Sequence, residues 1–460
     1  HKHGSEEQKK LYLPKLIEGT WSGTMNLTEP HCGTDLGLIK TRAAPVEGEE
    51  GAYRITGTKI YISAGEHDLT ENIVHLVLAR LPDAPEGVKG ISLFVVPKFL
   101  AEQKDDGDWG PGERNALECG GIEEKMGIHG SSTCVMNFDG AKGWLVGAPH
   151  KGLRAMFTMM NAARLGVGMQ GLGIAEVAYQ NAAQFAKERL QMRSLAGPQY
   201  SEKDADPIIV HPDVRRMLLT MKAFTEGARA LSYWVGMNLD IAEHHPDADK
   251  RREAEDFVSL LTPVIKAYQT DMGFECANLA IQVYGGHGYV QDYGVEQYAR
   301  DARITMIYEG TNGIQALDLV GRKMSQNTGR LLRRFFHPVA DFIELKQDDP
   351  NLQEFILPLA KSFSKLQQAT ATLAQKGLKN PLEAGAGSTD YLRLFALTAM
   401  AYMWAQMAEK AIEKKAEGGD KGDFYATRIH IARFFMQRML PESDACFKKL
   451  MSGGETLMAM

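Results

Sequence analysis

The spacing of apolar residues changes near residue 150, and this change limits the folds that the chain can adopt. From Met25 to about Gly147, short runs such as AYRITGTKIYISAG and NIVHLVLARL alternate between apolar and polar residues, with Gly, Pro and Asp between the runs. Such runs indicate β-strands, and strands without intervening helices predict a β-barrel or a sandwich. After Lys151, apolar residues recur every three or four positions, which indicates long helices.

These patterns predict a multi-domain α+β fold with four parts. Residues 1–24 contain a helix with apolar Leu11, Leu13 and Leu16, and we expect them to be the remnant of an N-terminal helical domain whose earlier part is missing. The other expected parts are a middle β domain (25–150), a helical bundle (151–327) and an additional C-terminal helical domain (328–460). The polar, glycine-rich stretch near 100–121 is expected to be a surface loop inserted into the β domain.

Charge and cysteine content exclude several classes of protein. Fifty-two basic residues against 58 acidic residues give a net charge of −6, which argues against a nucleic acid or an anionic membrane as the main partner. No apolar run approaches the roughly 18 residues that a membrane span requires. The five cysteines are scattered and form no Cys-x-x-Cys pair, so we expect reduced thiols in a cytoplasmic protein, without a disulfide framework or a metal site.

The glycines at 166, 168 and 171 match the letters of a dinucleotide-binding fingerprint but not its context. That fingerprint follows a β-strand, whereas the pattern here lies inside a predicted helix. We expect these glycines, together with Gly173, to let neighbouring helices pack closely.

Four segments carry residue types that are common in binding and catalysis: MNLTEPHCGTDLG (25–37), GTKIYISAG (57–65), QVYGGHGY (282–289) and RITMIYEGTNGIQ (303–315). Each segment also has an ordinary structural explanation. The first resembles a Gly/Asp turn, the second an edge strand and the third a glycine-rich loop. In the fourth, the helix dipole favours Glu309 two residues before a Thr N-cap without any catalytic role.

Taken in order, the four segments resemble the acyl-CoA dehydrogenase family over residues 1 to about 325. The C-terminal helical block and the wording GTNGIQALDLVGRK resemble a subgroup with broad-range fatty acyl-CoA dehydrogenases of bacteria and methylthiopropionyl-CoA dehydrogenases. The resemblance implies a cytoplasmic flavoenzyme, as in fatty acid β-oxidation, that oxidises an acyl-CoA to its trans-2-enoyl-CoA. FAD would be the cofactor, and electron-transfer flavoprotein is the expected electron acceptor.

The resemblance also implies how FAD is held, between the β domain and the helical bundle. Because the family builds this site across a contact between two copies, it implies a homodimer or a dimer of dimers. The implied cofactor-binding residues are Leu27, Thr28, Thr34, Tyr61, Ser63, Arg189, Gln282, Gly285, Gly286 and Thr311. The implied substrate-binding residues are Thr34, Arg164, Tyr308 and Gly310.

Glu309 is the implied catalytic base. Oxidation at Cα–Cβ requires removal of a weakly acidic α proton while a hydride leaves Cβ for flavin N5. A carboxylate in a water-poor pocket is a stronger base because desolvation raises its pKa. We expect Ile307 and Tyr308 to supply apolar surroundings and Gly310 to let the thioester approach. The resemblance implies an oxyanion hole formed by the Glu309 N–H and a flavin ribityl hydroxyl.

Residue 163 bears on which side chain is the base. Some members of the family carry their base in the first bundle helix, immediately before an arginine that contacts substrate. Here that position is Ala163, next to Arg164, so Glu309 is the remaining candidate. Arg164 itself is either a substrate contact or an arginine in an ion pair.

Two other functions remain open from the sequence. An acyl-CoA oxidase on the same fold would pass electrons to oxygen, although the C-terminal GGETLMAM is not a peroxisomal signal of the Ser-Lys-Leu type. A catalytically silent scaffold would keep the fold without the reaction, and the presence of Glu309 with the cofactor positions argues against it.

Overall fold

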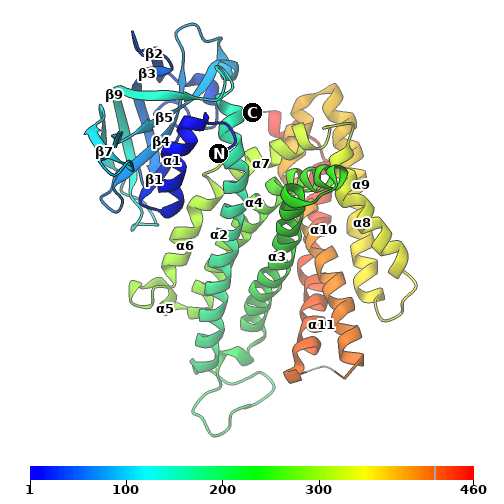
Figure 1. The fold of residues 1–460 in the computed structure, drawn as a ribbon. Helices are drawn as coiled ribbons and strands as arrows, with labels where there is room; N and C mark the ends of the chain where they lie inside the picture. The colour runs from blue at the N-terminus through cyan, green and yellow to red at the C-terminus, as the bar shows by residue number, and fades with distance from the viewer. Residues whose placement is uncertain (419–420, 460) are drawn as a thin grey trace. The chain divides into compact units, whose positions relative to one another are not determined.

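The computed structural model describes residues 1–418 and 421–459, which form two compact units. We call His1–Ala162 the β unit and Ala163–Met460 the helical unit (Figure 1).

The β unit begins with helix α1 (Glu6–Glu18), as the apolar spacing predicts. Ser5 and Gln8 form a capping box at its start, and Gly19 ends it in the left-handed conformation. Leu11 and Leu16 of this helix pack against a cluster that contains the buried Trp21.

The main sheet of the β unit closes into a barrel. Its ring runs β4–β5–β9–β3–β2 and returns to β4 where Arg42 lies opposite Arg80, while β1 pairs with β4 and β8 pairs with β9. Inward-facing Ile55, Val77 and Phe94 are fully buried, as the alternation predicts. The strands are β1 (Trp21–Asn26), β2 (Arg42–Pro45), β3 (Ala52–Ser63), β4 (Asn72–Arg80), β5 (Ile91–Pro97), β8 (Leu117–Ile122) and β9 (Thr133–Val146).

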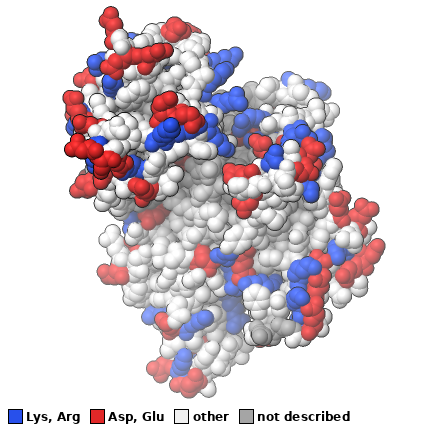
Figure 2. Space-filling view, viewed as in Figure 1, with Lys and Arg blue, Asp and Glu red and all other residues white. Residues whose placement is uncertain are grey.

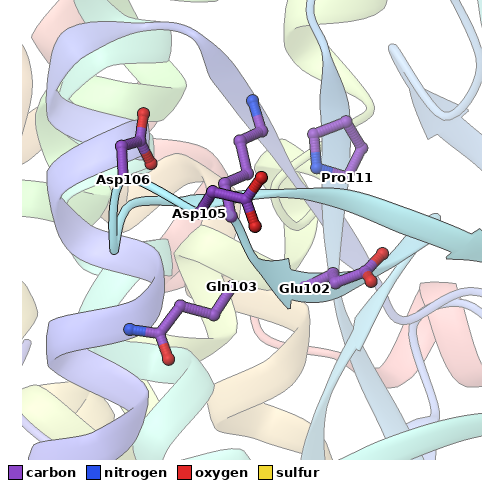
Figure 3. Close-up of a pocket in the computed structure, with 6 residues that line it drawn as sticks. Glu102, Gln103, Asp105, Asp106 and Pro111 are labelled. Carbon is purple, nitrogen blue, oxygen red and sulfur yellow. The ribbon is translucent and has the colours of Figure 1, made fainter.

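The prediction of a surface loop at 100–121 is wrong, because most of this stretch is paired as strand. β6 (Phe99–Gln103) and β7 (Trp109–Arg114) form a hairpin, and β8 follows at once. Figure 3 shows the hairpin, with acidic and amide side chains on β6 and at the turn. The sequence did not indicate these strands because their polar residues show no apolar alternation, which backbone pairing does not require. The Asn115 side chain supports the pairing by donating hydrogen bonds to Pro97 O and Lys142 O.

The long helices expected after residue 151 are confirmed; the first of them, α2, begins in the β unit and continues into the helical unit. Pro212 occupies the first turn of α3, and Asp247 caps α4 through its side chain. The helices are α2 (Gly152–Glu188), α3 (Pro212–His244), α4 (Ala248–Tyr284), α5 (Gly286–Tyr289), α6 (Glu296–Arg303), α7 (Asn312–Asp318), α8 (Arg330–Lys346), α9 (Gln353–Lys379), α10 (Pro381–Ala416), α11 (Phe424–Phe434), α12 (Glu442–Met451) and α13 (Glu455–Met458). Short 3₁₀ and π-helical turns join several of them, including η5 (Ile304–Met306) and η6 (Leu319–Lys323).

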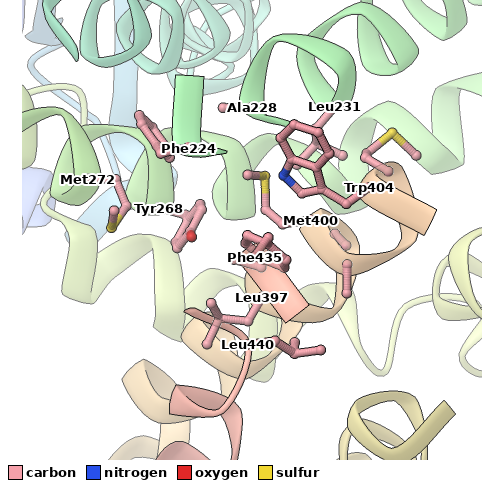
Figure 4. Packing of buried hydrophobic residues seen from close by; sticks show 14 of the residues in the cluster. Phe224, Ala228, Leu231, Tyr268, Met272, Leu397, Met400, Trp404, Phe435 and Leu440 are labelled. Carbon is pink, nitrogen blue, oxygen red and sulfur yellow. The ribbon is translucent and has the colours of Figure 1, made fainter. Parts of the chain in front are cut away.

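The described helices of the helical unit share a hydrophobic core that runs from α2 to α12. Figure 4 shows Phe224 and Leu231 of α3, Tyr268 of α4 and Trp404 of α10 gathered in this core. The fully buried Trp404 donates its indole N–H to Ala223 O at 3.1 Å, which satisfies its polar group inside the core. The C-terminal helices therefore pack directly on the helices that carry the candidate site.

The glycines of α2 follow the sequence prediction only in part. A Cβ on Gly168 would lie 2.7 Å from Ile265 Cγ2, and one on Gly171 would lie 2.5 Å from Gln269 O, so both permit close packing of α2 on α4. Gly166 and Gly173 face open space, and the packing prediction is wrong for these two.

Positive and negative side chains are interspersed on the visible face of each unit, as Figure 2 shows. Within the described residues, no helix combines the length and the apolar character that crossing a bilayer requires.

Candidate active site

Glu309 and Gly310 form a left-handed turn between η5 and α7. Their φ angles are +56° and +85°. A non-glycine residue in this region carries strain of about 1–3 kcal/mol, which the surrounding contacts must offset. The backbone conformation therefore favours glycine at 310, where a Cβ would also lie 2.8 Å from Gln315 Nε2. Thr311 then caps α7 by accepting a hydrogen bond from Ile314 N at 3.3 Å.

Three side chains hold this turn by its carbonyl groups. Glu309 O accepts hydrogen bonds from Arg164 Nε and from Gln315 Nε2, both at 3.2 Å. Gly310 O accepts from Lys266 Nζ at 2.9 Å and from Gln315 Nε2 at 3.0 Å. None of the described residues donates a hydrogen bond to the Glu309 carboxylate. The structure thus fixes the backbone of the candidate base and leaves its carboxylate free to take up a proton.

The surroundings of Glu309 raise its pKa. Burial is the largest cause, and the positive charges of Arg164 and Lys266 oppose it. A carboxylate with a raised pKa is a stronger base when it is ionised, which suits proton abstraction near neutral pH.

The prediction that Ile307 supplies apolar surroundings for Glu309 is wrong. Ile307 is 46% exposed, so much of its side chain faces solvent. Tyr308 is half-buried, and its hydroxyl donates to Gln170 Oε1. The environment of Glu309 is set instead by polar side chains that reach it from α2, α4 and α7.

The sequence suggested two alternative roles for Arg164, a substrate contact or an ion pair, and the structure shows an ion pair. It is 6% exposed, and its Nη1 lies 3.8 Å from Asp318 Oδ2. Asp318 also accepts hydrogen bonds from Arg322, so the cation is held between α7 and the turn. The expected contact between Arg164 and substrate stays a prediction.

Sequence reasoning missed Lys266 on α4. This lysine is 0% exposed, and its Nζ donates to Asn312 Oδ1 at 2.9 Å as well as to Gly310 O. Asn312 in turn donates to Asp271 Oδ1 at 2.6 Å. Burial lowers the pKa of Lys266 to about 8. The signal in the sequence was a single lysine within the otherwise weakly polar TPVIKAYQT stretch of a long helix.

The β unit brings five of the predicted cofactor residues into one region. Leu27 and Thr28 follow β1, and Ile60 N donates to Thr28 O at 3.0 Å, which places them beside the end of β3. At that end a bulge gives Tyr61 a φ of +59°, and its ring is 61% exposed. Ser63 is exposed two residues later, and Thr34 is exposed in the loop after Thr28.

A buried ion pair anchors this loop of the β unit. Lys59 Nζ donates to Leu27 O at 3.0 Å and to Glu29 Oε1 at 2.9 Å, and both ionic side chains are buried. Glu29 also accepts hydrogen bonds from Lys40 N, Thr41 N and Thr41 Oγ1. Burial alone would raise the pKa of Glu29, but Lys59 and these donors lower it.

Arg189, Gln282, Gly285 and Gly286 gather at the other end of α2. Phe185 stacks on Tyr284 with ring centroids 4.1 Å apart, which joins the end of α2 to the end of α4. Arg189 and both glycines are exposed, and a Cβ on either glycine would meet open space. Since Arg189 follows Arg164 by 25 residues, the two lie about 37 Å apart along α2. The helical unit therefore separates this group from Glu309 and Thr311, as the positions of α5 and α7 show (Figure 1).

Three family models match the chain. Residues 24–141 match the acyl-CoA dehydrogenase middle domain, and residues 150–324 match the acyl-CoA dehydrogenase C-terminal domain. Residues 335–460 match the model described as acetyl-CoA dehydrogenase C-terminal like.

Curated relatives and a solved structure agree with these models. A 3-methylmercaptopropionyl-CoA dehydrogenase of Ruegeria pomeroyi is 46% identical over 99% of this chain and 76% of the relative. A broad-specificity linear acyl-CoA dehydrogenase of Mycobacterium tuberculosis is 36% identical over 95% of this chain and 73% of the relative. An acyl-CoA dehydrogenase of Bacillus anthracis complexed with FAD has the same fold, with a TM-score of 0.76 at 24% identity, over 97% of this chain and 72% of that one. These matches confirm the predicted family and fold: the chain belongs to the acyl-CoA dehydrogenase family of oxidoreductases.

Proposed function

We propose that this protein is an FAD-dependent acyl-CoA dehydrogenase that oxidises an acyl-CoA thioester to its trans-2-enoyl-CoA, with Glu309 as the catalytic base. The observation that carries the proposal is the Glu309 turn. Its backbone is held by three side chains, while its desolvated carboxylate accepts no hydrogen bond from the described residues.

The exposed residues at the predicted cofactor positions fit the chemistry of FAD. The Tyr61 ring and the Ser63 hydroxyl offer an aromatic surface and a hydrogen-bonding group for a flat ring system with a polar edge. The Arg189 cation and the bare backbone of Gly285 and Gly286 suit an anionic pyrophosphate. When bound, FAD supplies the acceptor for the hydride that leaves Cβ.

The chain's own contribution is the proton transfer. The ionised Glu309 carboxylate takes the α proton, and the C–H electron pair stays on the substrate as the hydride departs from Cβ. Burial makes this carboxylate basic, and Arg164 and Lys266 keep it ionised over a useful pH range. Fixing the turn beforehand means that little reorganisation is needed during the reaction.

The assembly proposed is a homodimer or a dimer of dimers. Arg164 and Arg189 lie roughly 37 Å apart along α2, so the Arg189 group is remote from the Glu309 turn of its own copy. The Arg189 group of one copy therefore serves the cofactor whose flavin works beside Glu309 of another copy. Electron-transfer flavoprotein is the proposed acceptor, and location in the cytoplasm stays a prediction from cysteine usage.

The proposed substrate is a fatty acyl-CoA or 3-methylmercaptopropionyl-CoA. The names of the relatives at 46% and 36% identity support these two classes. A panel of linear acyl-CoAs and 3-methylmercaptopropionyl-CoA, each tested for bleaching of the bound flavin, will rank them.

Substitution of Glu309 tests the proposal directly. Glu309→Gln should keep the yellow flavin and bind acyl-CoA, while flavin bleaching slows by at least about 100-fold because the base is gone. Glu296→Gln, which removes a carboxylate paired with Arg300 on α6, is the matched control and should bleach normally. Bleaching of Glu309→Gln at near the wild-type rate would show that another group is the base.

Two further measurements distinguish the proposed dehydrogenase from an acyl-CoA oxidase and from a catalytically silent scaffold. Peroxide formation in air without reduction of an artificial acceptor would identify an oxidase instead of a dehydrogenase. A purified wild-type protein that stays colourless with added FAD would support a silent scaffold.

A further inference from the structure

A buried positive charge lies beside the Glu309 turn, and the described residues offer it no ion pair. Lys266 uses its Nζ to bind Gly310 O and Asn312 Oδ1, both of which are neutral acceptors. The nearby Asp271 is reached only through the Asn312 amide. A fully buried ammonium without a contacting carboxylate is costly, so its presence calls for an explanation.

The position of the ammonium suggests what it does. The Gly310 carbonyl that it binds belongs to the second of two left-handed residues, and the first is the candidate base itself. Loss of this hydrogen bond would leave Gln315 as the remaining donor to Gly310 O among the described residues, and the strained turn would have fewer contacts to hold it. This hydrogen bond therefore ties Lys266 to the turn that carries Glu309.

We propose that Lys266 is a positioning residue for Glu309: its ammonium holds the Gly310 carbonyl and thereby the left-handed turn, and its positive charge favours the ionised form of the carboxylate. This proposal rests on the proposed function of Glu309 and adds to it a group that never touches the substrate.

The charges around the site define the expected electrostatic effect. Glu309 is faced by Arg164 from α2 and by Lys266 from α4. Lys266 is faced by Asp271, Arg164 and Glu309. Arg164 is largely engaged by Asp318 beside Arg322, so Lys266 is the cation whose charge is least offset by contact with a carboxylate. Its removal should therefore raise the pKa of Glu309.

Lys323 in η6 provides a matched control. It is also buried, burial also lowers its pKa to about 8, and it belongs to the same helical unit. Its Nζ donates to Ser259 Oγ, and none of its hydrogen bonds to described residues reaches the turn. Lys323→Met removes a similar buried charge without removing a hydrogen bond to the base.

The test compares Lys266→Met, Lys266→Gln, Lys266→Arg and Lys323→Met in the full FAD-bound protein. Lys266→Met should lower kcat by about 10- to 100-fold because the base is misplaced, while KM stays within about twofold. Lys266→Arg, which keeps the charge and a donor, should recover part of the rate. Lys323→Met should keep the wild-type rate.

A second readout follows the base without the redox step. Exchange of the substrate α protons for deuterium in D₂O, measured by mass spectrometry across pH, reports proton abstraction alone. Both Lys266→Met and Lys266→Gln should shift the midpoint of this exchange to higher pH, because a carboxylate without a neighbouring cation keeps its proton longer. Lys266→Gln should lose less rate than Lys266→Met because its amide still offers a donor.

Three outcomes would overturn the proposal. Lys266→Met could match Lys323→Met in rate and in exchange midpoint, it could change KM instead of kcat, or neither neutral variant could bind FAD while Lys323→Met does. The last result would make Lys266 a folding residue. A wild-type protein that neither bleaches nor exchanges α protons, or a Glu309→Gln variant that does both normally, would refute the proposed function, whereas the three outcomes above refute the role of Lys266 alone.

Discussion

The loop after β1 in the β unit and the Glu309 turn in the helical unit are each anchored by a fully buried lysine, but the two charges are balanced differently. Lys59 binds the Leu27 carbonyl and also the carboxylate of Glu29. Lys266 binds the Gly310 carbonyl and only a side-chain amide besides. In both places a flexible side chain from a regular element reaches a backbone carbonyl of an irregular segment.

The difference between these lysines indicates different roles. In the β unit, Lys59 and Glu29 neutralise each other, so the pair holds the loop without projecting much charge beyond it. In the helical unit the positive charge remains available to act on the neighbouring Glu309. A neutralised lysine suits a segment that must only keep its shape, whereas a lysine without a contacting carboxylate suits a segment that carries the proposed base.

The largest expected effect comes from breaking the neutral pair. Glu29→Gln should lower the free energy of unfolding by about 3–5 kcal/mol, because it leaves the Lys59 charge buried without its partner. Urea unfolding of the full protein, followed by tryptophan fluorescence, measures the loss. The double variant Glu29→Gln, Lys59→Met should recover much of the stability. A loss below about 1 kcal/mol in the single variant would mean that the pair is not an anchor.

The pH dependence of stability distinguishes the unneutralised lysine. The pKa of Lys266 falls from 10.5 to about 8 on folding, so between these values the folded protein has released a proton that the unfolded chain still binds. Stability of the wild type should therefore rise with pH across this window relative to Lys266→Met, as the cost of the buried charge disappears. Urea unfolding at pH 7, 8, 9 and 10 tests this. A difference between the two proteins that is independent of pH would contradict it.

A smaller effect on the free energy of unfolding is expected from replacing a glycine in each of the two segments, Gly310 in the Glu309 turn and Gly33 in the loop after β1. Gly310→Ala should cost about 1–2 kcal/mol, since alanine is disfavoured at a φ of +85° and its Cβ would meet Gln315. Gly33 is exposed with a φ outside that region, and its Cβ would lie 3.3 Å from Thr28 Cγ2. Gly33→Ala should stay within about 0.5 kcal/mol. Thermal unfolding of both variants checks the comparison, and equal losses would show that backbone strain is not the cause.

Much of the fold could be predicted because the relevant signals are local. The change from a period of two to a period of three or four separates barrel strands from helices without reference to distant residues. Thr311 as a helix cap and Pro212 at a first turn are likewise local features. The hairpin at β6 and β7 was missed because its strands are polar and glycine-rich, so only their pairing with each other reveals them.

The candidate site shows the same division. Glu309 was proposed as the base from its own segment together with a family resemblance. The expected role of Ile307 failed because its exposure depends on tertiary packing, which the local sequence does not show. The hydrogen bonds that hold the Glu309 and Gly310 carbonyls could not be predicted, since their donors lie on three helices that meet only after folding. These donors are Arg164, Lys266 and Gln315.

The sequence by itself determined the change from strands to helices, the candidate base and the family to which the chain belongs. Periodicity, capping residues and motifs are properties of neighbouring residues, and they survive without a tertiary structure. The tertiary structure decided the conformation and the electrostatic surroundings of Glu309. Burial and charge depend on which side chains, distant in the sequence, pack against a segment. The contact between Lys266 of α4 and the Gly310 carbonyl, for example, forms only when the chain folds.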